Sequence, residues 1–102
     1  MKFDFYTPSE ITTILGERLK KQRLLANFSQ HELAQKSGVG ISTVARIETG
    51  QAGTFENVVR IATALGLINE FSELFLPKPH NIDQVLEHQN IRQRASSKKN
   101  KS

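Results

Sequence analysis

The strongest constraint on the fold of this chain is a tight turn that separates two short amphipathic segments within residues 29–50. Ser29 is followed three positions later by Glu32, which is the arrangement of a capping box at a helix N-terminus. Gly38 ends this helix, because the turn needs a residue that tolerates a positive φ. A second helix follows the turn and is closed by Gly50. The spacing therefore predicts two short helices packed against each other across a tight turn.

The apolar residues of both segments recur at helical spacing, so each helix has one inward face. The inward residues are Leu33 and Ala34 in the first helix, Val39 in the corner, and Val44 and Ile47 in the second helix, residues 41–49. The opposite face of the second helix is polar and basic. This pattern is typical of a DNA-binding helix-turn-helix. A helical hairpin that binds no ligand is the alternative interpretation.

The sequence resembles the Cro/repressor-type helix-turn-helix regulators, also called the Xre family. The resemblance extends over residues 15–66 and is most specific in residues 28–34 and 42–50. It implies an all-α fold, a compact five-helix domain whose third helix enters the DNA major groove, and a transcriptional repressor, not an enzyme. Two positions depart from the family pattern. Gly40 stands where Ser or Thr commonly caps the recognition helix, and Ile41 stands where polar base-reading residues are frequent.

The rest of the chain predicts three further helices. Thr7 and Glu10 form a second capping box, so the first helix of the domain should begin at residue 8, and Thr54 should cap the fourth. We expect a fifth helix from about Asn69 to Phe75. The expected inward residues include Ile11, Ile14, Leu15, Leu19 and Leu25 in the first helix and Phe55, Val58, Ile61, Ala62 and Leu65 in the fourth.

These patterns predict four regions. They are an N-terminal arm (1–7), a helix-turn-helix domain (8–76), an extension with a possible short helix (77–91) and a disordered basic tail (92–102).

The net charge of +4 is unevenly distributed. The tail holds Arg92, Arg94, Lys98, Lys99 and Lys101 and no acid, so it carries +5 and the remaining chain sums to 4 − 5 = −1. Within that remainder, residues 18–46 hold six cations against Glu32 alone, whereas residues 47–91 are acidic. A basic half that coincides with the helix-turn-helix indicates a phosphate-binding face. The tail is expected to add non-specific attraction to DNA or to dock on an acidic partner, unless it only solubilises the chain.

The DNA contacts can be assigned by position. The expected base-reading residues are Ile41, Ser42, Thr43 and Arg46, and the expected phosphate contacts are Ser29, Gln30, Thr49 and Gln51. Arg46 suits the O6 and N7 atoms of guanine, and Ile41 suits a thymine methyl group. A role in helix capping is the alternative for Ser42 and Thr43.

The resemblance also implies an ion pair between Arg23 and Glu48, which would make Arg23 structural and not a phosphate ligand. One small domain covers little DNA, so we expect a homodimer on palindromic double-stranded DNA. The expected dimer or partner surface is Phe71, Leu74 and Phe75, with completion of the core as the alternative.

The region after residue 73 looks like that of the HipB-like antitoxins, Xre regulators that accompany HipA-type kinase toxins. This resemblance implies autoregulation and a HipA-like kinase toxin as partner. The alternatives are a phage or restriction-modification control repressor and a protein-interaction adaptor with a degenerate helix-turn-helix. The three histidines show no metal-ligand or catalytic pattern, and the chain has no cysteine, so we expect no catalytic residue, metal or cofactor. No apolar run is long enough to cross a membrane, and a cytoplasmic, nucleoid-associated protein is expected.

Overall fold

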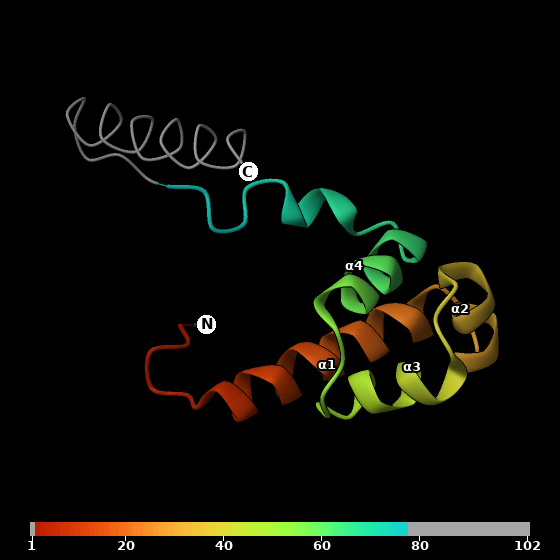
Figure 1. The fold of residues 1–102 in the computed structure, drawn as a ribbon, viewed down its shortest axis with the longest axis horizontal. Helices are drawn as coiled ribbons and strands as arrows, with labels where there is room; N and C mark the ends of the chain where they lie inside the picture. The colour runs from red at the N-terminus through yellow and green to blue at the C-terminus, as the bar shows by residue number, and fades with distance from the viewer. Residues whose placement is uncertain (1, 78–102) are drawn as a thin grey trace, which may run out of the picture. The chain divides into compact units, whose positions relative to one another are not determined.

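The computed structural model describes residues 2–77, and every regular element in that range is helical. The elements are α1 (Pro8–Leu25), α2 (Gln30–Ser37), α3 (Ile41–Glu48), α4 (Phe55–Ala64) and the 3-10 helix η1 (Ile68–Phe71), shown in Figure 1. They all belong to one compact unit, Met1–Ser72, while residues 73–102 form a second unit. The prediction of an all-α domain is confirmed. The predicted tail and, apart from Pro77, the predicted extension lie outside the described residues.

Both predicted capping boxes are present. The Thr7 hydroxyl accepts a hydrogen bond from the Glu10 backbone N–H (3.1 Å), and the Glu10 carboxylate accepts one from the Thr7 N–H (3.0 Å). Ser29 and Glu32 make the same reciprocal pair at the start of α2, at 3.0 and 3.1 Å. These backbone N–H bonds hold the pKa of Glu10 and of Glu32 below the ordinary value of a glutamate. Both carboxylates are therefore ionised at neutral pH, where they complement the helix dipoles.

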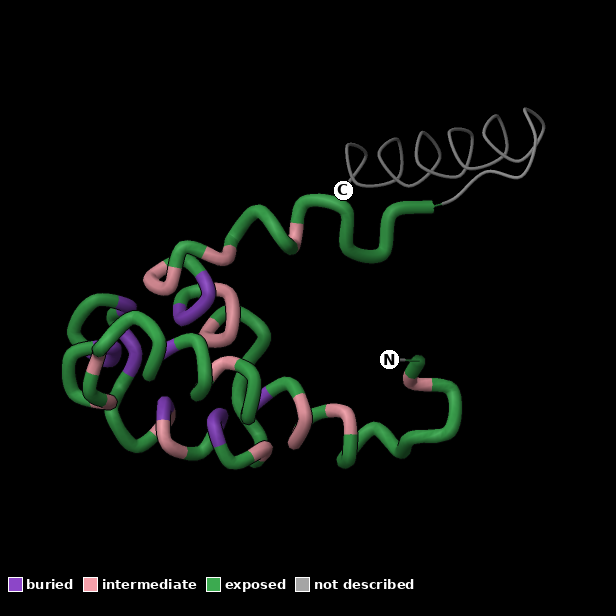
Figure 2. The backbone as a smooth tube through the Cα atoms, turned by 180° about the vertical axis from the view of Figure 1, so that it is seen from behind, coloured by how far each residue is buried: buried purple, intermediate pink, exposed green. Residues whose placement is uncertain are grey.

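The core lies where α2, α3 and α4 meet. Leu33 and Val44 are fully buried, and Ile61 of α4 is 1% exposed. Figure 2 shows the buried residues on the four helices and in the turn between α2 and α3, where Val39 is buried. Gly38 takes the left-handed conformation expected of it, with φ +71°. The predicted packing of the two short helices is therefore confirmed.

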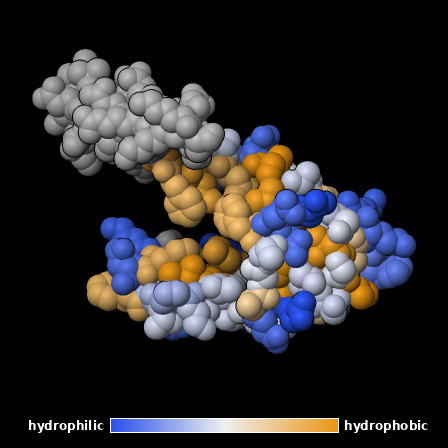
Figure 3. Space-filling view, in the orientation of Figure 1, coloured by the Kyte–Doolittle hydropathy of each residue, from blue (hydrophilic) through white to orange (hydrophobic). Residues whose placement is uncertain are grey.

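Three predicted inward residues are wrong. Leu15 is 44% exposed, and Leu25, in the last turn of α1, is 68% exposed. Phe55 is 64% exposed because it is the first residue of α4, and its ring packs edge-to-face on Phe71 at 6.4 Å between centroids. Helical spacing assigns residues to one face of a helix, but it does not say how much of that face is covered by the neighbouring helices. Apolar side chains accordingly reach the surface seen in Figure 3.

The predicted fifth helix is also wrong in its extent and type. The regular element there is η1, and residues 72–75 form turns. The Ser72 hydroxyl donates to the Asn69 carbonyl (2.8 Å), and Phe75 has φ +63°. A left-handed residue cannot continue a right-handed helix, so the chain leaves the helical path before the prolines.

The backbones of α1 and of the end of α3 lie in direct contact. A Cβ atom at Gly16 would overlap the carbonyl oxygen of Ile47 and stand 3.1 Å from that of Glu48. Gly50, with φ +81°, packs on Thr13 in the same way. Glycine at these two positions sets how closely α1 and α3 approach.

Gly16→Ala should lower the free energy of unfolding by about 1–3 kcal/mol, because the new methyl group meets backbone that cannot rotate away. The measurement is urea unfolding followed by circular dichroism. Gln22→Ala, an exposed position on the same helix, is the matched control and should change stability by less than about 0.5 kcal/mol. Equal unfolding midpoints for Gly16→Ala and wild type would contradict the close approach.

Candidate nucleic-acid interface

Helix α3 has one buried face and one exposed polar face. Val44, Ile47 and Glu48 are buried, at 0%, 6% and 3% exposure. Each residue advances about 100° around a helix, which puts Ser42 and Arg46 on the opposite side, and both are exposed. The face that points away from the core is therefore free to meet a large ligand.

The two remaining predicted base-reading residues lie at the borders of this face. Ile41, the first residue of α3, is 48% exposed. Thr43 is half-buried, and its hydroxyl accepts a hydrogen bond from Nη2 of Arg46 at 3.2 Å. The structure thus places Ile41, Ser42 and Arg46 at the surface, with Thr43 beside Arg46.

The start of α3 bears on the alternative role of Ser42 and Thr43. The N-cap is Gly40, and no side chain makes a cap hydrogen bond there. The Thr43 backbone N–H donates to the Gly40 carbonyl at 3.0 Å instead. The hydroxyl groups of Ser42 and Thr43 are therefore not the N-cap of this helix.

The predicted phosphate contacts surround the N-terminus of α2 and the end of α3. The Ser29 hydroxyl accepts from the Glu32 N–H, so its own proton remains to be donated. Gln30 is half-buried, and one N–H of its amide donates to Glu48 Oε1 at 3.1 Å, which leaves the second N–H. The Thr49 hydroxyl donates to the carbonyls of Ala45 and Arg46, at 3.1 and 3.0 Å. Gln51 is exposed in the loop after α3.

A buried ion pair joins α1 to the last residue of α3. Arg23 is 6% exposed, and its Nε and Nη2 donate to the two carboxylate oxygens of Glu48 at 2.7 and 3.1 Å. Nη1 of Arg23 donates to the Phe28 carbonyl in the α1–α2 loop at 2.8 Å. With the Gln30 amide, the carboxylate of Glu48 accepts three hydrogen bonds. The burial of Arg23 removes it from the surface and leaves it unable to contact a phosphate in this conformation.

Arg23→Ala should lower the free energy of unfolding by about 3–5 kcal/mol, because it leaves the Glu48 carboxylate buried without a counter-charge. Urea unfolding compares it with Arg46→Ala, an exposed arginine whose removal should change stability by less than about 0.5 kcal/mol. If Arg23→Ala unfolded at the same urea concentration as wild type, the pair would not hold α1 and α3 together.

The exposed cations of residues 18–46 come from three helices. With Arg23 neutralised inside, the exposed ones are Arg18, Lys20 and Lys21 on α1, Lys36 on α2 and Arg46 on α3. The Lys36 ammonium lies over the Phe28 ring at 5.0 Å, and the Arg18 guanidinium over Phe3 at 5.6 Å. These exposed cations lie on the two helices of the helix-turn-helix and on α1, which precedes them. Their positive charge suits the binding of a polyanion such as DNA.

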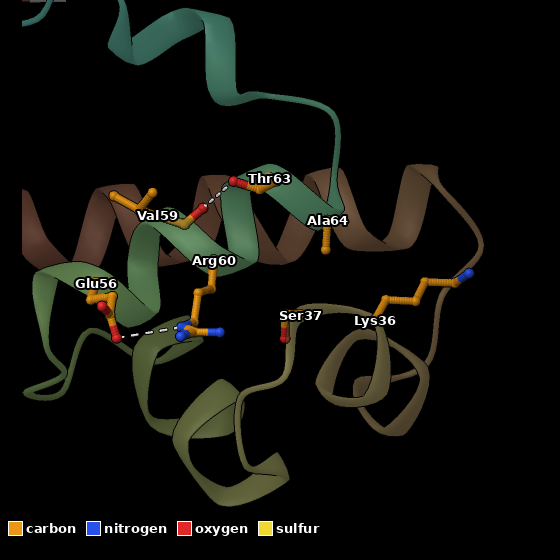
Figure 4. Close-up of a pocket in the computed structure, with 7 residues that line it drawn as sticks. All are labelled: Lys36, Ser37, Glu56, Val59, Arg60, Thr63 and Ala64. Carbon is orange, nitrogen blue, oxygen red and sulfur yellow. Dashed lines mark hydrogen bonds and ion pairs between the residues drawn. The ribbon is translucent and has the colours of Figure 1, made fainter.

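A cleft lies between α2 and α4, but its two cationic side chains do not converge on a common point where a ligand could bind. Figure 4 shows that the Lys36 ammonium points away from the other lining residues, while Arg60 turns towards Glu56. The Arg60 Nε–Glu56 Oε2 distance is 3.4 Å, and both side chains are largely exposed.

Among residues 2–77, no three acidic or histidine side chains are grouped so that they could hold a metal ion. None of the helices in that range combines the length and apolar character of a bilayer-spanning segment.

The predicted dimer or partner residues have different surroundings. Phe71 is half-buried against Phe55 within the first compact unit. Leu74 and Phe75 belong to the second unit and are 44% and 86% exposed. The five cations of the predicted tail lie outside the described residues.

Two contacts of this region have no signal in the sequence, and a third has one that sequence reasoning did not use. The Phe28 carbonyl that receives Arg23 is a backbone group, which any residue type supplies equally. The bond between Gln30 and Glu48 joins residues 18 positions apart. The contact between Thr43 and Arg46 had a signal, because residues three apart on a helix are neighbours.

Comparison with known families agrees with this geometry. Residues 19–69, half of the 102-residue chain, match the family model described as "Helix-turn-helix". The matched range begins within α1 and ends within η1, so it includes all of α2, α3 and α4. No curated protein matches the chain.

Proposed function

This chain belongs to the Xre/Cro-type helix-turn-helix family, and from that premise we propose that it is a sequence-specific DNA-binding repressor of transcription. The family is a DNA-binding one whose members are typically not enzymes. The observation that carries the proposal is the division of α3 into a buried face and an exposed polar face that ends in Arg46. A helix of this kind fits the major groove, where base edges differ in their donors and acceptors.

In this proposal the exposed face of α3 reads the bases. Arg46 donates to O6 and N7 of a guanine, and Ser42 donates to or accepts from a neighbouring base. Ile41 packs on a thymine methyl group, which is a suitable use of an exposed apolar side chain at the start of the helix.

The phosphate backbone is held from both sides of α3. The hydroxyl proton of Ser29 and the second amide N–H of Gln30 are available at the N-terminus of α2, whose dipole also favours an anion. Gln51 approaches the backbone from the loop after α3. Thr49 joins it after its hydroxyl rotates away from the carbonyls it now contacts.

Arg46→Ala should weaken binding to the preferred duplex by about 1–3 kcal/mol per half-site and relax the preference at one base pair. The preferred duplex is selected by the wild-type protein from a random DNA library, and binding is measured by fluorescence anisotropy. Arg60→Ala, an exposed arginine on α4 outside the helix-turn-helix, is the control and should retain the preference. A wild-type protein that enriches no sequence would overturn the proposed function.

We further propose that the protein binds as a homodimer. A single small domain offers about 600–1,000 Å² to DNA, which is modest for a specific complex. Two copies on a palindrome double that area. The exposed apolar residues Leu74 and Phe75, with Phe71, are the proposed contact surface between the copies or with another protein.

Footprinting on the selected duplex should show two symmetric protected halves whose centres lie about one helical turn apart, ~34 Å. Each half corresponds to one copy of α3 in the major groove. The double variant Leu74→Ser/Phe75→Ser should bind with lower affinity at low protein concentration, while the wild type at the same concentration protects both halves. A single asymmetric protected segment would contradict the dimer.

The finer proposal is an autoregulatory antitoxin of a HipA-type kinase toxin, in the cytoplasm. It rests on the resemblance of residues 74–95, with the lysine-rich end that follows them, to HipB-like antitoxins. The basic tail would then add non-specific attraction to DNA or dock on an acidic face of the toxin. A kinase-like gene beside this one would favour the antitoxin over a phage or restriction-modification repressor. Partner binding without any DNA binding would favour the adaptor.

A further inference from the structure

Thr43 differs from the other threonines within the helices in the use of its hydroxyl group. Thr12 and Thr13 in α1 and Thr63 in α4 each donate to the carbonyl four residues earlier, at 2.8–3.1 Å. This is the ordinary arrangement for a helical threonine. The Thr43 hydroxyl instead accepts a hydrogen bond from Nη2 of Arg46, 3.2 Å away.

The position of Thr43 explains this difference. It lies in the first turn of α3, so the carbonyl four residues earlier belongs to Val39, which precedes the helix. The N-cap at Gly40 has no side chain, and a Cβ atom there would have Thr43 Oγ1 as its nearest neighbour, at 3.9 Å. The glycine that departs from the family pattern therefore leaves the space beside this hydroxyl open.

The hydrogen bond restrains Arg46 without using up its capacity to bind a base. An arginine has five N–H donors, and the bond to Thr43 takes one of the two on Nη2. The other N–H of Nη2 and both on Nη1 remain for the O6 and N7 of a guanine. Thr43 is half-buried and branched at Cβ, so its own rotamer is restricted by the helix.

We propose that Thr43 is a positioning residue that holds the Arg46 guanidinium in the orientation needed to read a guanine, and that it does not itself read a base. This inference rests on the proposed DNA-binding function and refines the role of one residue within it. A long exposed arginine otherwise samples many rotamers, and restricting them before binding lowers the entropy lost in the complex. The preference at the base pair read by Arg46 then depends on a residue that does not touch that pair.

The test is a double-mutant cycle on the duplex that the wild-type protein selects from a random library. Thr43→Val keeps the shape of the side chain and removes the hydroxyl, whereas Thr43→Ser keeps the hydroxyl. Each is measured alone and combined with Arg46→Ala, against the selected duplex and against duplexes changed at single base pairs. Thermal unfolding of every variant is measured alongside, and Thr43→Ala gives a second hydroxyl-free variant with no added bulk.

We expect Thr43→Val and Thr43→Ala to weaken binding by about three- to tenfold, the range for ordering one long side chain on binding, and to reduce discrimination at the base pair that Arg46→Ala also affects. Thr43→Ser, which keeps the hydroxyl group, should retain the affinity and the discrimination of the wild-type protein. In the Arg46→Ala background, Thr43→Val should have no further effect. The thermal midpoints should match that of the corresponding protein with Thr43.

Two outcomes would overturn the inference while the proposed function stands. If Thr43→Val weakened binding equally with and without Arg46, Thr43 would contact DNA itself. If Thr43→Val and Thr43→Ala bound and discriminated as wild type, the hydrogen bond would have no role in recognition. Failure of the wild-type protein to select any sequence is a separate result and would overturn the proposed function first.

Discussion

The ion pair between Arg23 and Glu48 is the interaction on which the rest of this domain depends. It joins the end of α1 to the last residue of α3, and through the Phe28 carbonyl it also holds the loop that leads into α2. The Gln30 amide adds the first residue of α2 to the same carboxylate. Three helices thus meet at one buried polar cluster, and its position sets the orientation of α3.

This cluster contributes more to the arrangement of the helices than to the net free energy of unfolding. Two charges removed from water lose hydration that their attraction barely replaces, and well-packed apolar residues often stabilise a protein as much. Apolar packing, however, does not specify the direction of a helix as a two-bonded guanidinium–carboxylate pair does. The close approach at Gly16 complements the pair, because it lets the backbones of α1 and α3 come together where the ion pair links the same two helices.

The local structure of the helices could be predicted from the sequence, whereas the surroundings of the helix ends could be predicted less well. Capping boxes and the left-handed Gly38 follow from neighbouring residues, so they were predictable, and the core around Leu33 and Val44 followed from helical spacing. The exposure of Leu25 and Phe55 depends on where neighbouring elements stop, which spacing does not contain. The turns at 72–75 depend on the backbone conformation of Phe75, a residue type that rarely adopts positive φ.

In the candidate site, helical spacing predicts which residues of α3 share a face, but it does not predict how far each side chain is buried. Helix α3 carries its structural residues, Val44 and Glu48, on one face, and Ser42 and Arg46 on the other. Substitutions on the exposed face remove no buried contact, so they can alter recognition with little loss of stability. Thr43 lies at the border between the two faces, where a half-buried side chain has a restrained rotamer and still reaches Arg46. Under the proposed function, this border position would let the core restrain the exposed side chain that reads a base.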